Sequence, residues 1–98
     1  MTLRVVFRRA AHDEFSEAAA WYDRQRSGLG DEFVAEIEIA IGRAAESPIL
    51  YPMVFGDIRR TATRRFPYSI FFRVRGEFLV VLAVFHGRRD PQKWQRWT

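Results

Sequence analysis

The fold is decided by residues 68–85, which read YSIFFRVRGEFLVVLAVF. Apolar side chains at every second position of residues 68–75 show the period of a half-buried strand. Residues 78–85 are apolar throughout, which predicts a central strand covered on both faces. We expect a two-residue turn at Arg75-Gly76 between them, because glycine supplies the positive φ that tight hairpin turns require. The stretch therefore predicts an antiparallel hairpin at the centre of a sheet.

Two helices are predicted before this hairpin. The apolar side chains of residues 10–26 recur with a period of 3.6 residues, and those of residues 31–46 do the same. The first stripe consists of Ala11, Phe15, Ala18, Ala19 and Tyr22. The second consists of Phe33, Ile37, Ile41 and Ala44. The short break at residues 27–30 makes the two helices an antiparallel hairpin, and Ser47-Pro48 ends the second one.

Two further strands complete the predicted domain, which spans residues 1–98. Residues 3–7 predict an apolar first strand, and residues 57–65 predict a polar strand that Phe66-Pro67 interrupts, since proline cannot donate to a ladder. The order β-α-α-β-β-β gives an α+β fold, with the helical hairpin packed on one face of a small, mainly antiparallel sheet. We expect the other face to remain partly open and to be lined by arginines.

Composition excludes several classes of protein. The chain has no cysteine, which rules out disulfides and thiolate chemistry, and only His12 and His86 remain as soft ligands, which rules out a finger-type zinc site. The longest apolar run, residues 78–85, is far shorter than the roughly 20 residues of a membrane span, and no secretion signal is visible. We therefore expect a cytoplasmic protein without a membrane segment, and no residue pattern calls for a metal or an organic cofactor.

Charge is unevenly divided along the chain. Residues 1–50 carry six arginines against nine acidic residues, a balance of −3. Residues 51–98 carry nine arginines and one lysine against three acidic residues, a balance of +7. A codon bias in the genome also enriches arginine, but it does not explain this segregation. The basic half favours binding to phosphates or to an acidic protein partner.

Three segments carry recognisable motifs. They read AAAWYDRQ (18–25) with GLGDEF (28–33), PILYP (48–52) with RFPYSIFF (65–72), and VLAVFHGRRDP (81–91) with Trp94. In this order they resemble the RelE/ParE superfamily of toxins from type II toxin–antitoxin modules. The resemblance covers nearly the whole chain. It implies a toxin of the plasmid-stabilisation type that is held inactive, in a hetero-oligomer, by an antitoxin encoded beside it.

The resembled superfamily has two activities. RelE-like members cut mRNA on the ribosome, whereas ParE-like members inhibit DNA gyrase and are binders rather than enzymes. The Trp21-Tyr22 pair and the ending at residues 88–91 look more ParE-like. We therefore expect a ParE-like gyrase inhibitor, with a RelE-like ribosome-dependent endoribonuclease as the alternative.

Metal-independent RNA cleavage would need an acid, a base and a group that stabilises charge on the phosphoryl oxygens. His86 has an ordinary pKa near neutrality, and Arg88 and Arg59 are candidates for the phosphoryl charge. A second acid or base is hard to find, because Lys93 is the sole lysine and no tyrosine follows Tyr68. The sequence therefore favours the non-enzymatic inhibitor.

Contact with the target or the antitoxin is assigned to basic and aromatic side chains of the second half. The candidates are Arg59, Arg64, Arg65, Arg73, Arg88, Arg89, Trp94 and Trp97. A different class of function is plain nucleic-acid binding, in which bases would stack on Phe71, Phe72 and Phe85.

Several of these residues also have structural alternatives. Arg59 and Arg65 are suited to discourage edge-to-edge strand pairing. His86 is suited to a hydrogen bond with a backbone carbonyl at the end of its strand. Trp94 and Trp97 are suited to capping the open face of the sheet. The sequence leaves these alternatives open.

Overall fold

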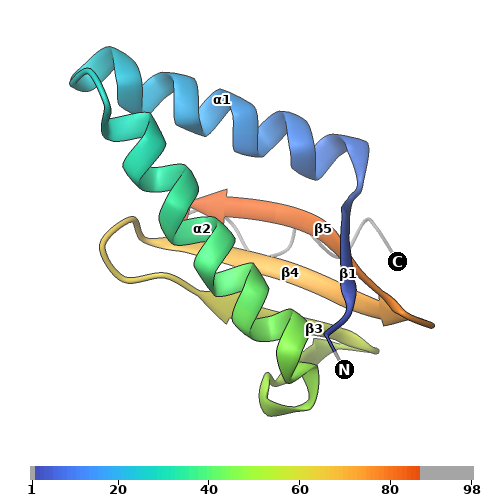
Figure 1. Ribbon diagram of the computed structural model, residues 1–98. Coiled ribbons are helices and arrows are strands. Elements are labelled where there is room, and N and C mark those ends of the chain that lie inside the picture. Colours follow the sequence, from blue (N-terminus) through green and yellow to red (C-terminus); the bar gives the residue numbers. More distant parts are fainter. Residues whose placement is uncertain (1, 87–98) are drawn as a thin grey trace.

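The computed structural model describes residues 2–86, which form two helices and a five-stranded sheet (Figure 1). In chain order the elements are β1 (Arg4–Phe7), α1 (Arg9–Gln25), α2 (Leu29–Glu46), the 3-10 turn η1 (Pro48–Leu50), β2 (Met53–Phe55), β3 (Ile58–Ala62), β4 (Tyr68–Arg75) and β5 (Phe78–His86). The α+β class and the predicted order of helices and longer strands are confirmed. The three-residue strand β2 was not expected, and β3 is shorter than the predicted strand over residues 57–65.

The strands lie in the order β1-β5-β4-β3-β2, so the predicted hairpin of β4 and β5 stands at the centre of the sheet. Strand β1 runs parallel to β5, and all other neighbours are antiparallel. The hairpin turn consists of Gly76 and Glu77, with Gly76 at a φ of 57°. The expected turn at Arg75-Gly76 is wrong by one residue, because Arg75 still pairs with Phe78 in the ladder.

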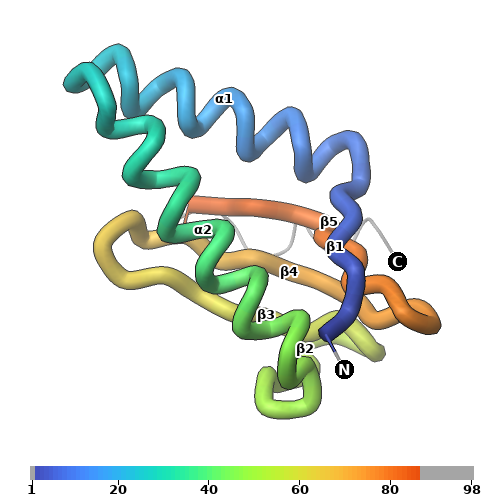
Figure 2. The backbone as a smooth tube through the Cα atoms, viewed as in Figure 1, coloured from blue at the N-terminus to red at the C-terminus, as the bar shows by residue number. Residues whose placement is uncertain are grey.

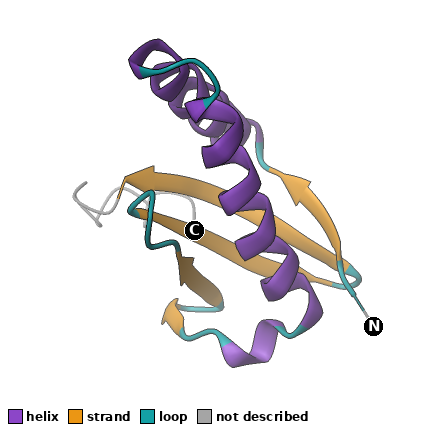
Figure 3. Ribbon diagram, turned by 60° about the vertical axis from the view of Figure 1, so that its left-hand side comes forward, coloured by secondary structure: helices purple, strands orange, loops and turns teal. Residues whose placement is uncertain are grey.

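Both helices cover the same face of the sheet (Figure 1 and Figure 3). Helix α2 begins at Leu29, two residues earlier than expected, directly after Gly28 with its φ of 89°. The helices approach closely at Gly30, whose backbone N–H donates to the Asp23 carboxylate at 2.7 Å. A glycine is required here because an added Cβ would overlap the Ala19 carbonyl oxygen of α1.

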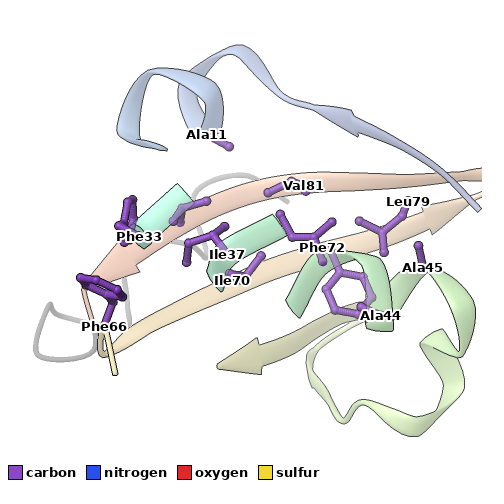
Figure 4. Close-up of a cluster of buried hydrophobic side chains, with 12 residues drawn as sticks. Ala11, Phe33, Ile37, Ala44, Ala45, Phe66, Ile70, Phe72, Leu79 and Val81 are labelled. Atoms are coloured by element: carbon purple, nitrogen blue, oxygen red, sulfur yellow. The ribbon is translucent and has the colours of Figure 1, made fainter. Parts of the chain in front are cut away.

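The main core fills the space between the helices and the sheet, as Figure 4 shows. Both predicted helical stripes contribute to it, through Ala11 of α1 and through Phe33, Ile37 and Ile41 of α2. The sheet supplies Ile70, Phe72, Leu79, Val81 and Val84. The periodicities of 3.6 and 2 thus identified the faces that form this main core.

A second buried cluster lies on the face of the sheet turned away from the helices. It consists of Ile58, Phe71, Leu82, Ala83 and Phe85. Phe71 pairs with Ala83 and Phe72 with Val81, so Leu82 is an extra residue in β5, a β-bulge. The bulge allows two consecutive side chains, Leu82 and Ala83, to join this cluster. This face was expected to remain partly open; its centre is buried.

A side chain protects the edge of β5 beyond the end of β1. Strand β1 pairs with β5 only as far as Phe7 opposite Val81. Further along β5, the backbone N–H of Val84 donates to the Glu14 carboxylate of α1 at 3.1 Å. An edge donor that would otherwise stay unpaired is thus satisfied by the helix lying above it.

Candidate functional site

The described residues among the predicted site do not share one surface. Arg73 lies on the face turned away from the helices, whereas Arg59 and His86 pair with residues of β4 that face them. Arg64 and Arg65 belong to the loop between β3 and β4. The expected arginine lining of the face turned away from the helices therefore includes Arg73, whereas Arg59, Arg64 and Arg65 lie elsewhere. Side chains alternate between the two faces along a strand, which separates neighbouring arginines. Arg64 and Arg65 lie in the turn at residues 63–67 and therefore on neither face.

On the face turned away from the helices, the guanidiniums lie at the rim of the second cluster. Arg73 donates to the Asp57 carboxylate at 3.0 Å, and Arg75 donates to it at 2.8 Å. Arg60 donates from Nε to the Ser69 hydroxyl at 3.0 Å. The buried aromatic rings between them, Phe71 and Phe85, are each only 4% exposed. With Phe72 fully buried, these rings offer no platform on which bases could stack.

Arg59 is held on the helix side of the sheet by the backbone that follows η1. Its Nη1 donates to the Tyr51 carbonyl oxygen at 2.7 Å, and it pairs with Phe72 in the β3–β4 ladder. His86 pairs with Tyr68, four residues away along β4. At about 3.3 Å per residue, the two positions are about 13 Å apart along that strand. Arg59 and His86 therefore do not converge on one phosphate, and this part of the predicted catalytic set is not assembled.

The surroundings of His86 are acidic and aromatic. Its ring stands edge-on to the Tyr68 ring, with centroids 5.4 Å apart. Both residues border a small cavity of about 210 Å³ together with Glu14, Glu17 and Trp21. Within residues 2–86, the border of this cavity carries two carboxylates and no guanidinium. The remaining predicted residues, Arg88, Arg89, Trp94 and Trp97, lie outside the described part of the chain.

The loop between β3 and β4 is fastened to α2 by two carboxylates. Glu32 accepts hydrogen bonds from Arg65 in the loop and from Arg26 at the end of the helical hairpin. Glu36, one helical turn later, accepts the backbone N–H of Phe66 at 3.2 Å. This fastening holds the loop along the side of α2 and defines an open groove between the helix and β3.

The groove has a volume of about 600 Å³, against about 210, 260 and 430 Å³ for three other cavities lined by described residues. Its lining comprises Glu32, Ala35, Glu36, Ile39, Ala40 and Arg43 of α2, with Ala62, Thr63, Arg64 and Arg65. Arg64 and Arg65 were predicted for a binding site, but the contribution of α2 was not. The sequence feature that could have indicated the contribution of α2 was Ile39, an apolar residue that lies off the buried stripe and is 56% exposed.

Two exposed carboxylates have lowered pKa values. The hydrogen bond from Arg65, and then that from Arg26, lowers the pKa of Glu32 below its ordinary 4.5. The hydrogen bond from Arg75, followed by that from Arg73, likewise lowers the pKa of Asp57. The two ion pairs at each carboxylate therefore favour its charged form and stabilise the fold only while it is ionised.

Replacing Glu32 with glutamine tests this coupling. Because folding lowers the pKa of Glu32, its contribution is complete above pH 4.5 and is lost as the pH falls through the lower folded value. We expect Glu32→Gln to be less stable than wild type at pH 7, with a difference that shrinks below pH 4.5. Urea unfolding at several pH values measures it.

The control for this experiment is Glu38→Gln. Glu38 is an exposed residue of the same helix that forms no ion pair within residues 2–86. Equal pH dependence of the two variants would contradict the assignment.

The described residues offer neither a metal site nor a membrane-spanning helix. No group of three or more His, Cys, Asp or Glu side chains there is arranged to hold a metal ion. No helix within that range has the length and apolar content needed to cross a bilayer.

A comparison with models of protein families shows to which family the chain belongs. The family model for the ParE toxin of the type II toxin–antitoxin system parDE matches residues 5–91. The chain belongs to the ParE toxin family. The predicted membership of the RelE/ParE superfamily, on its ParE branch, is thereby confirmed. A comparison of this ParE-type toxin with curated proteins gives no significant match.

Solved structures share the fold of this ParE-type toxin. A chain of the chromosomal ParDE toxin–antitoxin system from P. aeruginosa superposes with a TM-score of 0.75 at 17% identity, covering 87% of this chain and 96% of that one. A chain of the RelBE2 toxin–antitoxin complex from Mycobacterium tuberculosis gives a TM-score of 0.61 at 18% identity, covering 88% and 99%. At these identities the likeness concerns the arrangement of helices and strands.

Proposed function

We propose that this ParE-type toxin inhibits DNA gyrase and is neutralised by a cognate antitoxin within a hetero-oligomer. The observation that carries the proposal is the match of the ParE toxin family over residues 5–91. Both structural relatives come from toxin–antitoxin systems, which supports an antitoxin as the partner.

The placement of polar groups supports binding rather than RNA cleavage. Within residues 2–86, Arg59 is engaged by a backbone carbonyl, Arg65 by Glu32, and Arg73 by Asp57. None of these guanidiniums lines the cavity beside His86, whose border includes carboxylates. Metal-free cleavage needs proton transfer and charge stabilisation at one phosphate, and the described residues do not bring such groups together.

A supercoiling assay with purified gyrase tests the proposed target. We expect the purified toxin to inhibit ATP-dependent supercoiling in proportion to its concentration, and the product of the adjacent small gene to restore it. Translation in a cell extract should continue at the same toxin concentration. A variant with a disrupted core, such as Phe33→Ala, controls for folding because its activity should fall with its folded fraction.

The opposite result would support the alternative function. Abrupt arrest of translation, with cuts at codon positions and unaffected supercoiling, would replace the inhibitor with a ribosome-dependent endoribonuclease. In that case His86→Ala or Arg88→Ala should abolish cleavage while the fold stays intact.

A further inference from the structure

Helix α2 runs beside β3, as Figure 2 shows. The groove between them is bordered by an unpaired stretch of sheet edge. Strand β2 pairs with β3 only at Ile58 and Arg59, and one more hydrogen bond joins the Arg60 N–H to the Pro52 carbonyl at 3.1 Å. Beyond this point no described strand lies along the outer side of β3. The groove thus lies past the N-terminal end of β2.

The exposed main-chain groups at this edge belong to Ala62. The Thr63 N–H donates across the ladder to the Tyr68 carbonyl at 3.0 Å, whereas the Arg60 N–H points the other way, toward Pro52. Successive residues of an antiparallel strand alternate in this respect. The N–H and C=O of Ala62 therefore point away from β4, toward the groove, and they have no hydrogen-bond partner among residues 2–86.

Opposite this edge, α2 offers an apolar surface. Ile39 is 56% exposed, and Ala35 and Ala40 lie beside it in the lining of the groove. An extended peptide presents alternate side chains to opposite faces, so it can bond to Ala62 while directing apolar side chains toward Ile39.

The charges of the groove indicate what kind of segment fits. Its two carboxylates are already engaged, Glu32 by Arg26 and Arg65, and Glu36 by the Phe66 N–H. Arg43 and Arg64, which also line the groove, form no ion pair with any described residue. A partner that supplies carboxylates would pair these two guanidiniums.

We propose that the groove receives an extended, acidic segment of the antitoxin, which adds a strand to β3 at Ala62, packs an apolar side chain on Ile39 and places carboxylates at Arg43 and Arg64. This inference rests on the proposed function, because it takes the antitoxin as its partner. It goes further in naming the surface and the backbone pairing.

Charge reversal tests the pairing of the arginines. The toxin and its variants are titrated with the purified product of the adjacent small gene, and the dissociation constant is measured. We expect Arg43→Glu and Arg64→Glu each to weaken binding by at least about tenfold, since a lost charge-assisted contact is replaced by repulsion. Arg24→Glu makes the same change of charge on α1, outside the groove, and should bind within about twofold of wild type.

Amide hydrogen exchange tests the strand pairing without any substitution. The Ala62 N–H should exchange rapidly in the toxin alone and at least about tenfold more slowly in the complex. The groove would not be the binding site if the exchange at Ala62 stayed unchanged, or if Arg24→Glu, Arg43→Glu and Arg64→Glu bound equally well. Either result would leave the antitoxin as the partner. Failure of the wild-type toxin to bind the neighbour's product at all would overturn the proposed partner and this inference together.

Discussion

Replacement of Phe33 by alanine is expected to lower the free energy of unfolding by about 3–5 kcal/mol. The ring is fully buried, and it packs on Tyr22 of α1, on Phe66 of the loop before β4 and on Tyr68 of β4, with centroids 5.0, 5.5 and 4.9 Å away. Its loss would leave a cavity at the junction of both helices and the sheet. For a domain whose total stability is about 5–15 kcal/mol, this is a large fraction.

Urea unfolding followed by circular dichroism measures the change. The control is Ile49→Ala, because Ile49 is 80% exposed and its truncation should change the stability by less than about 0.5 kcal/mol. Comparable losses in the two variants would mean that Phe33 is not the centre of the core.

Two glycine substitutions in α2 are expected to act in opposite directions. In Gly30→Ala the new methyl group would overlap the Ala19 carbonyl oxygen and lie 2.7 Å from Asp23 Oδ1, so the helices must separate. The hydrogen bond from Gly30 to Asp23 would weaken as they do. Overpacking and this weakened bond together are expected to cost about 2–4 kcal/mol.

Gly42→Ala is the matched change. An added Cβ at Gly42 meets nothing within 4 Å, so only the gain in helix propensity remains. We expect this variant to be more stable than wild type by about 0.5–1 kcal/mol. Thermal unfolding of both variants gives the comparison, and a shift of the same sign in both would show that the contact at Gly30 does not set the separation of the helices.

The elements predicted from the sequence are those whose pattern is local. The alternation over residues 68–75 and the apolar run over residues 78–85 each report burial along one strand, and both strands form at these positions. The stripes of the two helices likewise depend only on spacing within a helix. Strand β2 was missed because three residues, Met53–Phe55, are too few to show a period.

Burial on both faces of β5 was predicted from its apolar run, but the burial of Phe71 on the outer face of β4 was not. It depends on the extra residue Leu82, which interrupts the alternation of β5 within a run that is apolar at every position. The sequence therefore offers no sign of where the bulge falls. The second cluster around Phe71 follows from that bulge and from pairing between strands.

The candidate site was predicted only in part. Arg64 and Arg65 do line the groove beside α2, but its other wall comes from α2 itself, about 20 to 30 residues earlier in the chain. The groove exists because Glu32 and Glu36 bind the loop to the helix. Such pairings between distant segments produce no periodic pattern in the sequence. The arginines of β3 and β4 were expected together, yet alternation in the strands divides them between two faces.

The carboxylate of Glu14 has a consequence for the behaviour of the free toxin. A bare strand edge is a template onto which another molecule's strand can add, and repetition of that step builds fibres. At Val84 the template is occupied by a charged side chain of the same molecule, and an incoming strand would have to displace and bury that charge. A single acidic residue of α1 thus acts as a gatekeeper against strand addition at the stretch of β5 that extends past β1, whereas no residue among 2–86 bonds to the edge of β3 at Ala62.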